Sequence, residues 1–321
     1  MLHRVRNGLL AAVLAAIGCT PLRDPCFTPQ SVITDLRVLG VRADPPEVLV
    51  DLDSGSVPSV DVRILVVDPN GPAKDAVVRA QLCVPDDAGC PAGTPEVAAA
   101  TNASGEAHFV ATPAAAMIRA SRDADPLLGY GGIRVQLDAT ARSSVGASSG
   151  RKMLLYTPRT PGAIANGAME ISGVKLLYAG DLHAVAPSGG TILLATGIAF
   201  GVRPVLAPGS IEEYDTVTLD GRNVRLTEHV SYNFYATQHL IFGDPRSGGS
   251  AVGSGNLQGG EVADEPGPGD PEPFNGLVRV QGFRNAEQFL WVVGRDGRGA
   301  VAWANIRVNQ AGQDLPEITC R

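Results

Sequence analysis

Cysteine is the residue type whose spacing in this chain most directly predicts chemistry. Five cysteines occur among 321 residues. Cys83 and Cys90 bracket the turn-rich stretch VPDDAG, which makes a local disulfide between them the easiest pairing. The loop-entropy model gives so short a loop a stabilisation of roughly 2.5 kcal/mol. The spacing C-x6-C is not a zinc signature, and no histidine lies near either thiol in the sequence, so we expect no metal site here.

Cys19 follows a segment with the pattern of a bacterial export signal. A charged start, HRVR at residues 3–6, precedes the apolar run Leu9 to Ile17, and AIGC at residues 16–19 resembles the lipobox of bacterial lipoproteins. Nine apolar residues at about 1.5 Å each are too few to span a hydrocarbon core of roughly 30 Å. We therefore expect residues 1–18 to be removed as a signal peptide. Cys19 would then carry a lipid in the cell envelope, at the periplasmic or surface face of the outer membrane, with secretion without a lipid as the alternative.

Lipidation of Cys19 leaves four cysteines, an even number in a compartment where disulfides persist. Three connectivities are formally open. If Cys83 pairs with Cys90, then Cys26 and Cys320 are left for each other. That second bond would tie the C-terminal tail to the start of the mature chain.

Neither the net charge nor the histidines point to catalysis or to nucleic-acid binding. The formal net charge is −7, so phosphate backbones would be repelled. His108 and His229 lie in predicted strands, and His183 and His239 lie near strand ends without acidic or cysteine neighbours at ligand spacing. No G-x-S-x-G, H-E-x-x-H or P-loop motif occurs. We expect no enzymatic activity, no cofactor and no nucleic-acid partner.

Two acidic turns are the remaining candidates for binding an ion. Asp51, Asp53 and Ser54 lie in DLDSGS, and a second group of carboxylates lies at residues 261–272. Neither follows the spacing of a calcium-binding loop, and calcium needs six to eight oxygens held together. Solvated acidic turns are therefore the favoured interpretation.

Alternation of apolar and polar residues with a period of two dominates the chain. Val60 to Val66, Val78 to Val84 and Ile133 to Thr140 show it, with turn sequences such as DPNG and NASG between such runs. One polar face is typical of antiparallel sheets half exposed to water. The alanine-rich stretch Pro113 to Ala120 predicts one helical turn at most. The expected fold is all-β, with two immunoglobulin-like antiparallel β-sandwich domains in tandem after the cleaved signal peptide.

The length of the mature chain suits two domains of ordinary size, separated by a segment rich in proline and glycine. A glycine- and proline-rich loop at residues 243–276 interrupts the second domain, and disorder is favoured over function for it. Strand regions of that domain are expected at 172–178, 190–201, 214–219, 224–237, 276–280 and 289–308. The expected boundaries are 1–18 for the signal peptide, 19–31 for the lipidated tether, 32–157 for the first sandwich, 158–167 for the linker, 168–310 for the second, immunoglobulin-like or PKD-like sandwich, and 311–321 for the C-terminal tail.

The sequence WVVGRDGRGAVAW at residues 291–303 predicts a hairpin whose turn decides where two tryptophans point. A two-residue turn at Asp296-Gly297, which this dipeptide favours, places Trp291 opposite Ala302 and turns Trp291 and Trp303 to opposite faces. The outward tryptophan, beside Phe289, is then a candidate contact for a sugar or a protein. Packing beneath the neighbouring domain is the favoured alternative for it. A three-residue turn would instead put both tryptophans on one face, in the core.

With these residues in view, LRVLGVRADPPEV at Leu36 to Val48 resembles an opening segment that recurs in lipoproteins of myxobacteria and related bacteria. Trp291 to Trp303 resembles the final hairpin of those proteins. A looser similarity covers EEY at Glu212 to Tyr214 and LTEHVSYNFYAT at Leu226 to Thr237, where relatives commonly carry a tryptophan at the position of Phe234. The resemblance covers most of the mature chain. It implies a lipid-anchored pair of immunoglobulin-like or PKD-like domains without an assigned activity or site.

Together these features predict a lipid-anchored cell-envelope protein that acts as a structural or protein-interaction module. The membrane would be contacted through the lipid on Cys19, and the partner would be another envelope protein. The alternative is a surface lipoprotein that binds a polysaccharide or a peptide, with Trp291 and Phe289 as its candidate contacts. Hydrolysis would need histidine, serine and carboxylate groups in one cleft, which their spacing gives no reason to expect.

Overall fold

The structure is a computed structural model that describes residues 31–160, 164–177, 183–195, 199–228, 230–237, 240–242, 276–280 and 287–311. All of these residues belong to one compact unit, Pro29–Ile318. Within these ranges, no helix has both the length and the apolar character needed to cross a bilayer.

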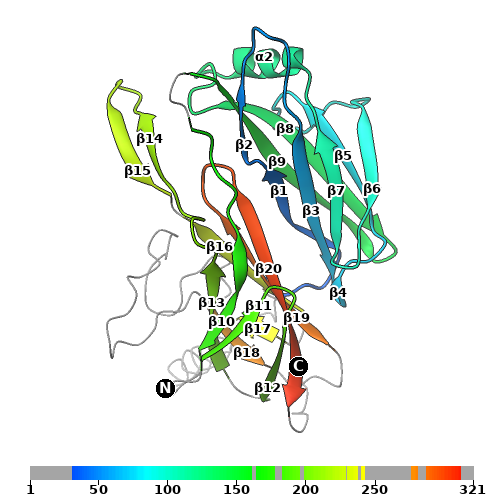
Figure 1. The fold of residues 1–321 in the computed structure, drawn as a ribbon. Helices are drawn as coiled ribbons and strands as arrows, with labels where there is room; N and C mark the ends of the chain where they lie inside the picture. Colours follow the sequence, from blue (N-terminus) through cyan, green and yellow to red (C-terminus); the bar gives the residue numbers. More distant parts are fainter. Residues whose placement is uncertain are drawn as a thin grey trace, which may run out of the picture. The chain divides into compact units, whose positions relative to one another are not determined.

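The first half of the unit, residues 31–160, folds into strands and one helix (Figure 1). Apolar residues alternate between buried and exposed positions along its strands, as in Val77–Cys83, where Val78 and Ala80 are buried and Val77 and Arg79 are exposed. The elements are β1 (Arg37–Asp44), β2 (Glu47–Val50), β3 (Val60–Asp68), β4 (Gly71–Pro72), β5 (Val77–Cys83), β6 (Glu96–Ala100), β7 (Glu106–Ala111), α2 (Ala115–Ala124), β8 (Ile133–Ser143) and β9 (Gly146–Pro158).

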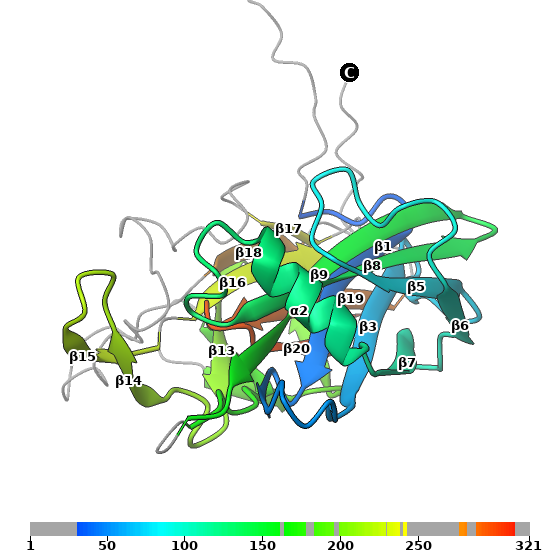
Figure 2. The same cartoon turned by 90° about the horizontal axis from the view of Figure 1, so that it is seen from above.

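The strands of this half form two sheets with an immunoglobulin-like order. In one sheet β3 pairs with β1 on one side and β7 on the other, and the short β4 pairs with the end of β3. The other sheet has the order β2-β9-β8-β5-β6. These positions correspond to strands A, B and E in one sheet and to the G, F, C, C′ series in the other. The helix α2, nearest the viewer in Figure 2, lies in the connection from β7 to β8.

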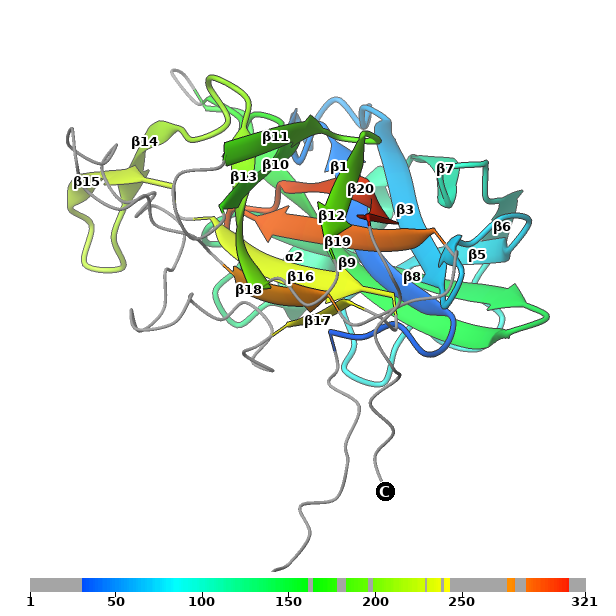
Figure 3. The same cartoon turned by 90° about the horizontal axis from the view of Figure 1, so that it is seen from below.

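The second half, residues 164–311, repeats this order (Figure 3). One sheet has the order β11-β10-β13-β18-β17, in which β10, β13, β18 and β17 correspond to A, B, E and D. The other has the order β12-β20-β19-β16, in which β20, β19 and β16 correspond to G, F and C. The strands β11 and β12 are additional edge strands. The pair β14–β15 is a separate two-stranded hairpin inserted between β13 and β16. The strands are β10 (Ile171–Leu177), β11 (His183–Pro187), β12 (Thr191–Ala195), β13 (Ala199–Leu206), β14 (Glu213–Val217), β15 (Asn223–Thr227), β16 (Ser231–Ala236), β17 (Leu240–Phe242), β18 (Gly276–Val280), β19 (Gln288–Arg295) and β20 (Val301–Ala311).

Buried apolar residues form three clusters among the described residues. One lies between the sheets of the first half and a second lies between the sheets of the second half. A third cluster joins the halves, because it combines Ile33, Leu39, Leu65 and Val67 of the first half with residues of β19 and β20. Hydrophobic burial therefore stabilises each sandwich and also the contact between them.

The strand order confirms the predicted all-β fold of immunoglobulin-like sandwiches. The predicted helix was too short, since α2 spans ten residues and buries Ile118 and Ser121, one turn apart, toward the first core. Such packing stabilises helices that propensity alone would leave marginal. The predicted strand regions 190–201 and 224–237 each contain parts of two strands. The signal peptide, the tether and most of the loop 243–276 lie outside the described residues.

Candidate functional site

The turn between β19 and β20 carries the central residues of the candidate site. The last pair of the two strands is Arg295 with Val301, so residues 296–300 form the turn. One carboxylate oxygen of Asp296 accepts hydrogen bonds from the backbone N–H groups of residues 298–300 at 2.8–2.9 Å. The two-residue turn predicted from Asp-Gly was therefore wrong. The Asp296 side chain holds a longer turn by replacing backbone acceptors.

The longer turn also changes where the tryptophans point. Trp291 pairs with Asn305 and Val293 pairs with Trp303, so both indoles lie on the same face of the hairpin. That face packs against the first half, and Trp291 and Phe289 are only 0% and 6% exposed. Their rings stack with centroids 5.6 Å apart. The candidate contact through Trp291 and Phe289 is therefore not exposed, and the favoured alternative, packing beneath the neighbouring half, is what the structure shows.

Close approach of the backbone of the first half makes this packing possible. A Cβ atom placed on Gly40 would lie 3.1 Å from the Trp303 ring, so only glycine fits there without displacing the indole. The Trp303 Nε1–H donates to Glu106 at 2.8 Å, and Arg295 donates to the backbone oxygen of Leu39 at 3.3 Å. Polar and apolar contacts thus connect the C-terminal hairpin to both β1 and β7.

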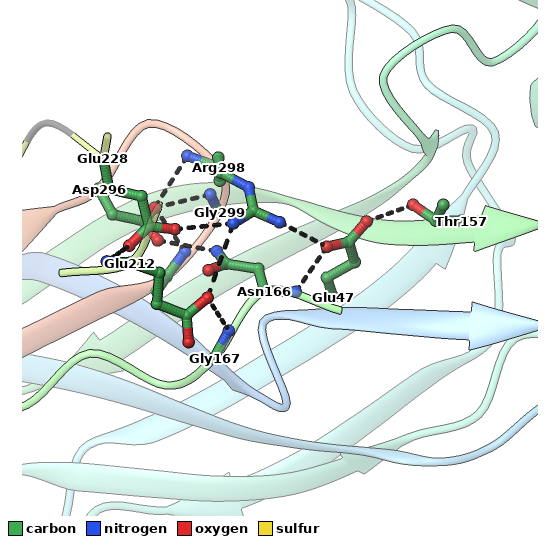
Figure 4. Close-up of polar contacts among 10 residues, drawn as sticks. Glu47, Thr157, Asn166, Gly167, Glu212, Glu228, Asp296, Arg298 and Gly299 are labelled. Carbon is green, nitrogen blue, oxygen red and sulfur yellow. Dashed lines mark hydrogen bonds and ion pairs between the residues drawn. The ribbon is translucent and has the colours of Figure 1, made fainter. Parts of the chain in front are cut away.

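Arg298 is the centre of a buried ionic cluster between the two halves (Figure 4). Its guanidinium donates to Glu228 at 3.0 Å and to Glu47 at 3.2 Å, and lies 3.7 Å from Glu212. The same guanidinium stacks over the Tyr214 ring at 4.0 Å from the centroid. The Arg298 side chain is 17% exposed, and those of Glu47 and Glu228 are 9% and 2% exposed. Glu47 belongs to β2 of the first half, so this arginine connects the two halves directly.

Each carboxylate around Arg298 is positioned by further donors. The backbone N–H of Asn166 donates to Glu47 at 2.6 Å, and the Thr157 hydroxyl donates to the other oxygen of Glu47. The backbone N–H of Glu212 donates to Glu228 at 2.9 Å. Burial raises the pKa of Glu228, while the hydrogen bond from Glu212 and the nearby charge of Arg298 lower it. The carboxylates are therefore held in place by the backbone as well as by the arginine.

Asn166 and Lys152 complete the cluster. The Asn166 amide donates to Asp296 at 2.8 Å, although its residue lies in the segment predicted to be a linker. The Lys152 ammonium group donates to the backbone oxygen of Gly299 in the turn. Burial lowers the pKa of Lys152 to about 8, with Asp296 raising it and Arg295 lowering it. A second cation from the first half therefore contacts the same turn.

The acidic residues of this cluster and Arg298 come from the segments that were singled out in the sequence by resemblance. Glu47 lies in LRVLGVRADPPEV, Asp296 and Arg298 lie in WVVGRDGRGAVAW, and Glu212 and Glu228 lie in the two looser segments. Sequence reasoning did not identify Arg298 or Glu47 as site residues. The signal that could have found them is the presence of charged residues inside otherwise apolar motifs, since a charge there needs a buried partner.

A cleft of about 1050 Å³ opens beside the ionic cluster. Leu49 of β2 and Met153 and Leu155 of β9 line it on the outer face of the first half. Residues 213–217, which form β14, line the opposite side, and Arg298 lines the inner end. The Tyr130 hydroxyl donates to the backbone oxygen of Val217 across the cleft. Both halves therefore contribute walls to one concave surface, which is the usual place for a ligand.

The structure confirms one predicted disulfide and leaves other predicted residues undescribed. Cys83 and Cys90 are bonded, and Asp138 accepts a hydrogen bond from the Cys90 backbone at 2.7 Å. Cys19, Cys26 and Cys320 lie outside the described residues, so the lipidation and the second disulfide stay predictions.

His108 and the first acidic turn show ordinary surface contacts. The His108 ring lies 3.5 Å from Asp61, with both side chains about 60% exposed on neighbouring strands. Asp51 accepts hydrogen bonds from the backbone of Asp53 and Ser54, which explains the turn without an ion. Within the ranges that the structure covers, no three His, Cys, Asp or Glu side chains are grouped so that they could hold a metal ion.

Comparisons with known proteins give no family for this chain. No family model and no curated protein sequence matches it. Among solved structures, a chimeric titin Z1Z2-Z1Z2 tandem is 10% identical over 87% of this chain and 97% of that chain, with a TM-score of 0.20. A C-terminal intimin fragment, in complex with the intimin-binding domain of its translocated receptor, is 8% identical over 84% and 63%, with a TM-score of 0.22. Red sea bream transglutaminase is 8% identical over 87% and 32%, with a TM-score of 0.26. These TM-scores do not establish a shared fold, so the immunoglobulin-like assignment rests on strand order.

Proposed function

We propose that this chain is a non-catalytic, lipid-anchored cell-envelope protein whose two immunoglobulin-like halves form a rigid protein-interaction module. The observation that carries this proposal is the buried contact between the halves. This contact, the joint, consists of the apolar cluster around Trp291 and the ionic cluster around Arg298. Cys19 would anchor the module through its lipid at the outer membrane, and an envelope protein would be the partner.

Rigidity follows from the chemistry of the joint. Domains connected by small polar interfaces move relative to one another by default. Here the third apolar cluster and the ionic cluster around Arg298 both cross between the halves. Separating the halves would leave Glu47 and Arg298 without each other and would expose Trp291 to water. The two halves therefore need not close on each other before a partner binds.

The groups in the cleft suit recognition better than catalysis. Of the carboxylates that line the cleft, Glu47 and Glu212 are neutralised by Arg298, and the Tyr214 ring is covered by the same guanidinium. A hydrolase needs a nucleophile paired with a base and an orienting group. His108 instead pairs with Asp61 on an exposed strand face. The alternative function is binding of a polysaccharide or a peptide. A peptide is the favoured ligand, because Trp291 and Phe289, the aromatic side chains that could have contacted a sugar, are buried.

The lipid anchor is tested by labelling cells with an alkynyl palmitate analogue and fractionating their membranes. Wild-type protein should be labelled and should sediment with the membranes, whereas Cys19→Ala should be unlabelled and soluble. A Cys19→Ala variant that is still attached to membranes would overturn the anchoring part of the proposal.

The interaction part is tested by photo-crosslinking in the native envelope. Ile164 lines the cleft and is 85% exposed, so it can be replaced by the photoreactive p-benzoylphenylalanine without removing a buried contact. Val110 on β7 is 59% exposed, does not line the cleft, and serves as the matched control. The proposal predicts a discrete crosslinked protein from position 164 and none of that size from position 110. No adduct from position 164, or the same adduct from both, would contradict a cleft-based interaction module.

A further inference from the structure

The edge of β14 that faces away from β15, and toward the cleft, is its outer edge. The backbone N–H and C=O groups on this edge are not paired with another strand. In the pair β14–β15, Glu228 N–H bonds to the Glu212 oxygen and Thr218 N–H bonds to the Arg222 oxygen. Hydrogen-bonded and non-hydrogen-bonded pairs alternate along an antiparallel ladder, so the N–H and C=O groups of residues 213, 215 and 217 point away from β15. The Val217 oxygen, which accepts from the Tyr130 hydroxyl, confirms this direction. No other backbone hydrogen bond to these outward groups occurs among the described residues.

The β14–β15 hairpin lacks the third strand that usually stabilises such a structure. It forms a two-stranded sheet that stands apart from the four larger sheets (Figure 1). Val217, Leu219 and Leu226 of the hairpin are 46%, 76% and 44% exposed. An isolated two-stranded hairpin is marginally stable in water, and an unprotected edge is a template for pairing with another chain. The hairpin therefore has both the backbone groups and the apolar surface to accept another strand.

The charge of the cleft indicates what kind of strand would bind. The whole chain has a net charge of −7. The cleft lining, in contrast, contains six cations and four carboxylates. Three of the cations have carboxylates outside the lining, because Arg298 pairs with Glu228, Arg151 pairs with Asp138, and Asp296 lies near Lys152. The cations are Arg134, Arg151, Lys152, Arg225, Arg295 and Arg298, and the carboxylates are Glu47, Glu212, Glu213 and Asp215. Arg134 is half-exposed, and its closest carboxylate lies 4.0 Å away at Asp125.

We propose that the cleft binds an extended, acidic segment of a partner protein, which adds to the outer edge of β14 as a third strand. This inference rests on the proposed function and names the chemistry of its partner. Main-chain hydrogen bonds to residues 213, 215 and 217 provide the pairing, as in other cases of strand addition. Alternate apolar side chains of the segment contact Leu49, Met153 and Leu155. Its acidic side chains lie near Arg134 and its neighbouring cations.

Synthetic peptides and residue-resolved amide exchange on the full chain, purified in detergent, test this proposal. The probe is a capped octapeptide in which valine alternates with aspartate. One control has lysine in place of aspartate, and another has the same residues in two blocks. The alternating acidic peptide, at up to about 1 mM, should slow exchange of the amides of residues 213, 215 and 217 by about tenfold or more. The lysine peptide and the block peptide should not.

A pair of proline variants separates strand addition from other binding modes. Val217→Pro removes an outward N–H on the cleft side, and Asn223→Pro removes the outward N–H of its cross-strand partner on the opposite edge. Both variants keep the hydrogen bonds between β14 and β15, and proline is tolerated at such edge positions. Val217→Pro should raise the Kd for the acidic peptide about tenfold, and Asn223→Pro should leave it within about twofold.

The outcomes distinguish this proposal from the broader one. Absence of protection on β14, protection on β15 instead, or equal binding by Val217→Pro would overturn strand addition. The interaction module would survive these results if position 164 still crosslinks a protein in the envelope. Equal binding of the lysine peptide would overturn the acidic character of the segment. Protection of β14 in the free protein at high concentration, lost on dilution, would identify a second copy of this chain as the occupant and would also overturn the proposal.

Discussion

Replacing Arg298 by methionine should destabilise the joint between the halves far more than replacing an exposed arginine. Methionine keeps most of the length of the side chain but removes the cation. Glu228 and Glu47, which are 2% and 9% exposed, then lose their counter-ion inside the joint. Removing one partner of a buried ion pair typically costs about 3–5 kcal/mol. For a unit of this size, each kcal/mol lowers the melting temperature by roughly 2 °C, so we expect a drop of about 6–10 °C.

Tryptophan fluorescence during urea unfolding is the assay of choice. The chain has two tryptophans, Trp291 and Trp303, and both lie in the apolar cluster that joins the halves. The matched control is Arg225→Met, which removes the arginine of an ion pair with Glu213 whose side chains are 65% and 60% exposed. Such a surface pair contributes about 0–1 kcal/mol. The reasoning would be refuted if Arg298→Met lost no more stability than Arg225→Met.

The pH dependence of the Arg298→Met variant provides an internal check. Without the arginine, burial favours the protonated form of Glu228, and its folded pKa lies above the unfolded value. The folded state then binds more protons, so stability rises as the pH falls toward the acid range. Glu228, whose pKa is already raised by burial, should protonate first. The deficit of the variant relative to wild type should therefore shrink on acidification, and adding Glu228→Gln should recover part of it at neutral pH.

Three further perturbations are predicted from other parts of the structure. Replacing Cys83 and Cys90 together by serine should lower the free energy of unfolding in urea by about 2.5 kcal/mol, a modest loss because the disulfide closes only a short loop. An unchanged urea midpoint would argue against a stabilising disulfide. The pKa of Lys152 is about 8 in the folded protein, against its usual 10.5. Between these two pH values the unfolded state binds the proton and the folded state does not, so the wild-type free energy of unfolding should rise by roughly 3 kcal/mol as the pH is raised. Lys152→Met should flatten this rise, and a parallel rise in both proteins would show that another group is responsible. Tyr130→Phe should speed amide exchange in β14 because the contact with Val217 is lost, while the urea midpoint reported by tryptophan fluorescence stays the same.

Local pattern identified strands such as β3 and β8 well because one face of such a strand is exposed along most of its length. Val60 to Val66 and Ile133 to Thr140 alternate in sequence, and burial follows this alternation along β3 and β8 except at Leu65 and Gln136. Leu65 is buried because it packs in the cluster that joins the halves. The disulfide between Cys83 and Cys90 was also predictable, since a turn between two cysteines brings them together without any help from the rest of the fold. Patterns of this kind depend only on neighbours in the chain.

The register of the last hairpin shows where local pattern fails. Asp-Gly is a strong signal for a two-residue turn, but the Asp296 carboxylate binds the N–H groups of residues 298–300 and also accepts from Asn166. Local hydrogen bonds therefore hold the longer turn, and a contact with a segment 130 positions away holds the same carboxylate in place. The change of register moves Trp291 from a candidate binding surface into the joint, because a shift in pairing changes which face a side chain occupies.

The sequence by itself determined the strands, the local disulfide and the all-β class, because these follow from alternation and turn chemistry among near neighbours. Only the tertiary structure decided that Glu47 and Arg298, 251 positions apart, would bind each other, and that a cleft would form beside them. A charged residue in a sequence does not reveal whether it will be desolvated or which partner will neutralise it. That depends on which surfaces the two sandwiches bury against each other, and the free energy of that burial is a property of the assembled chain.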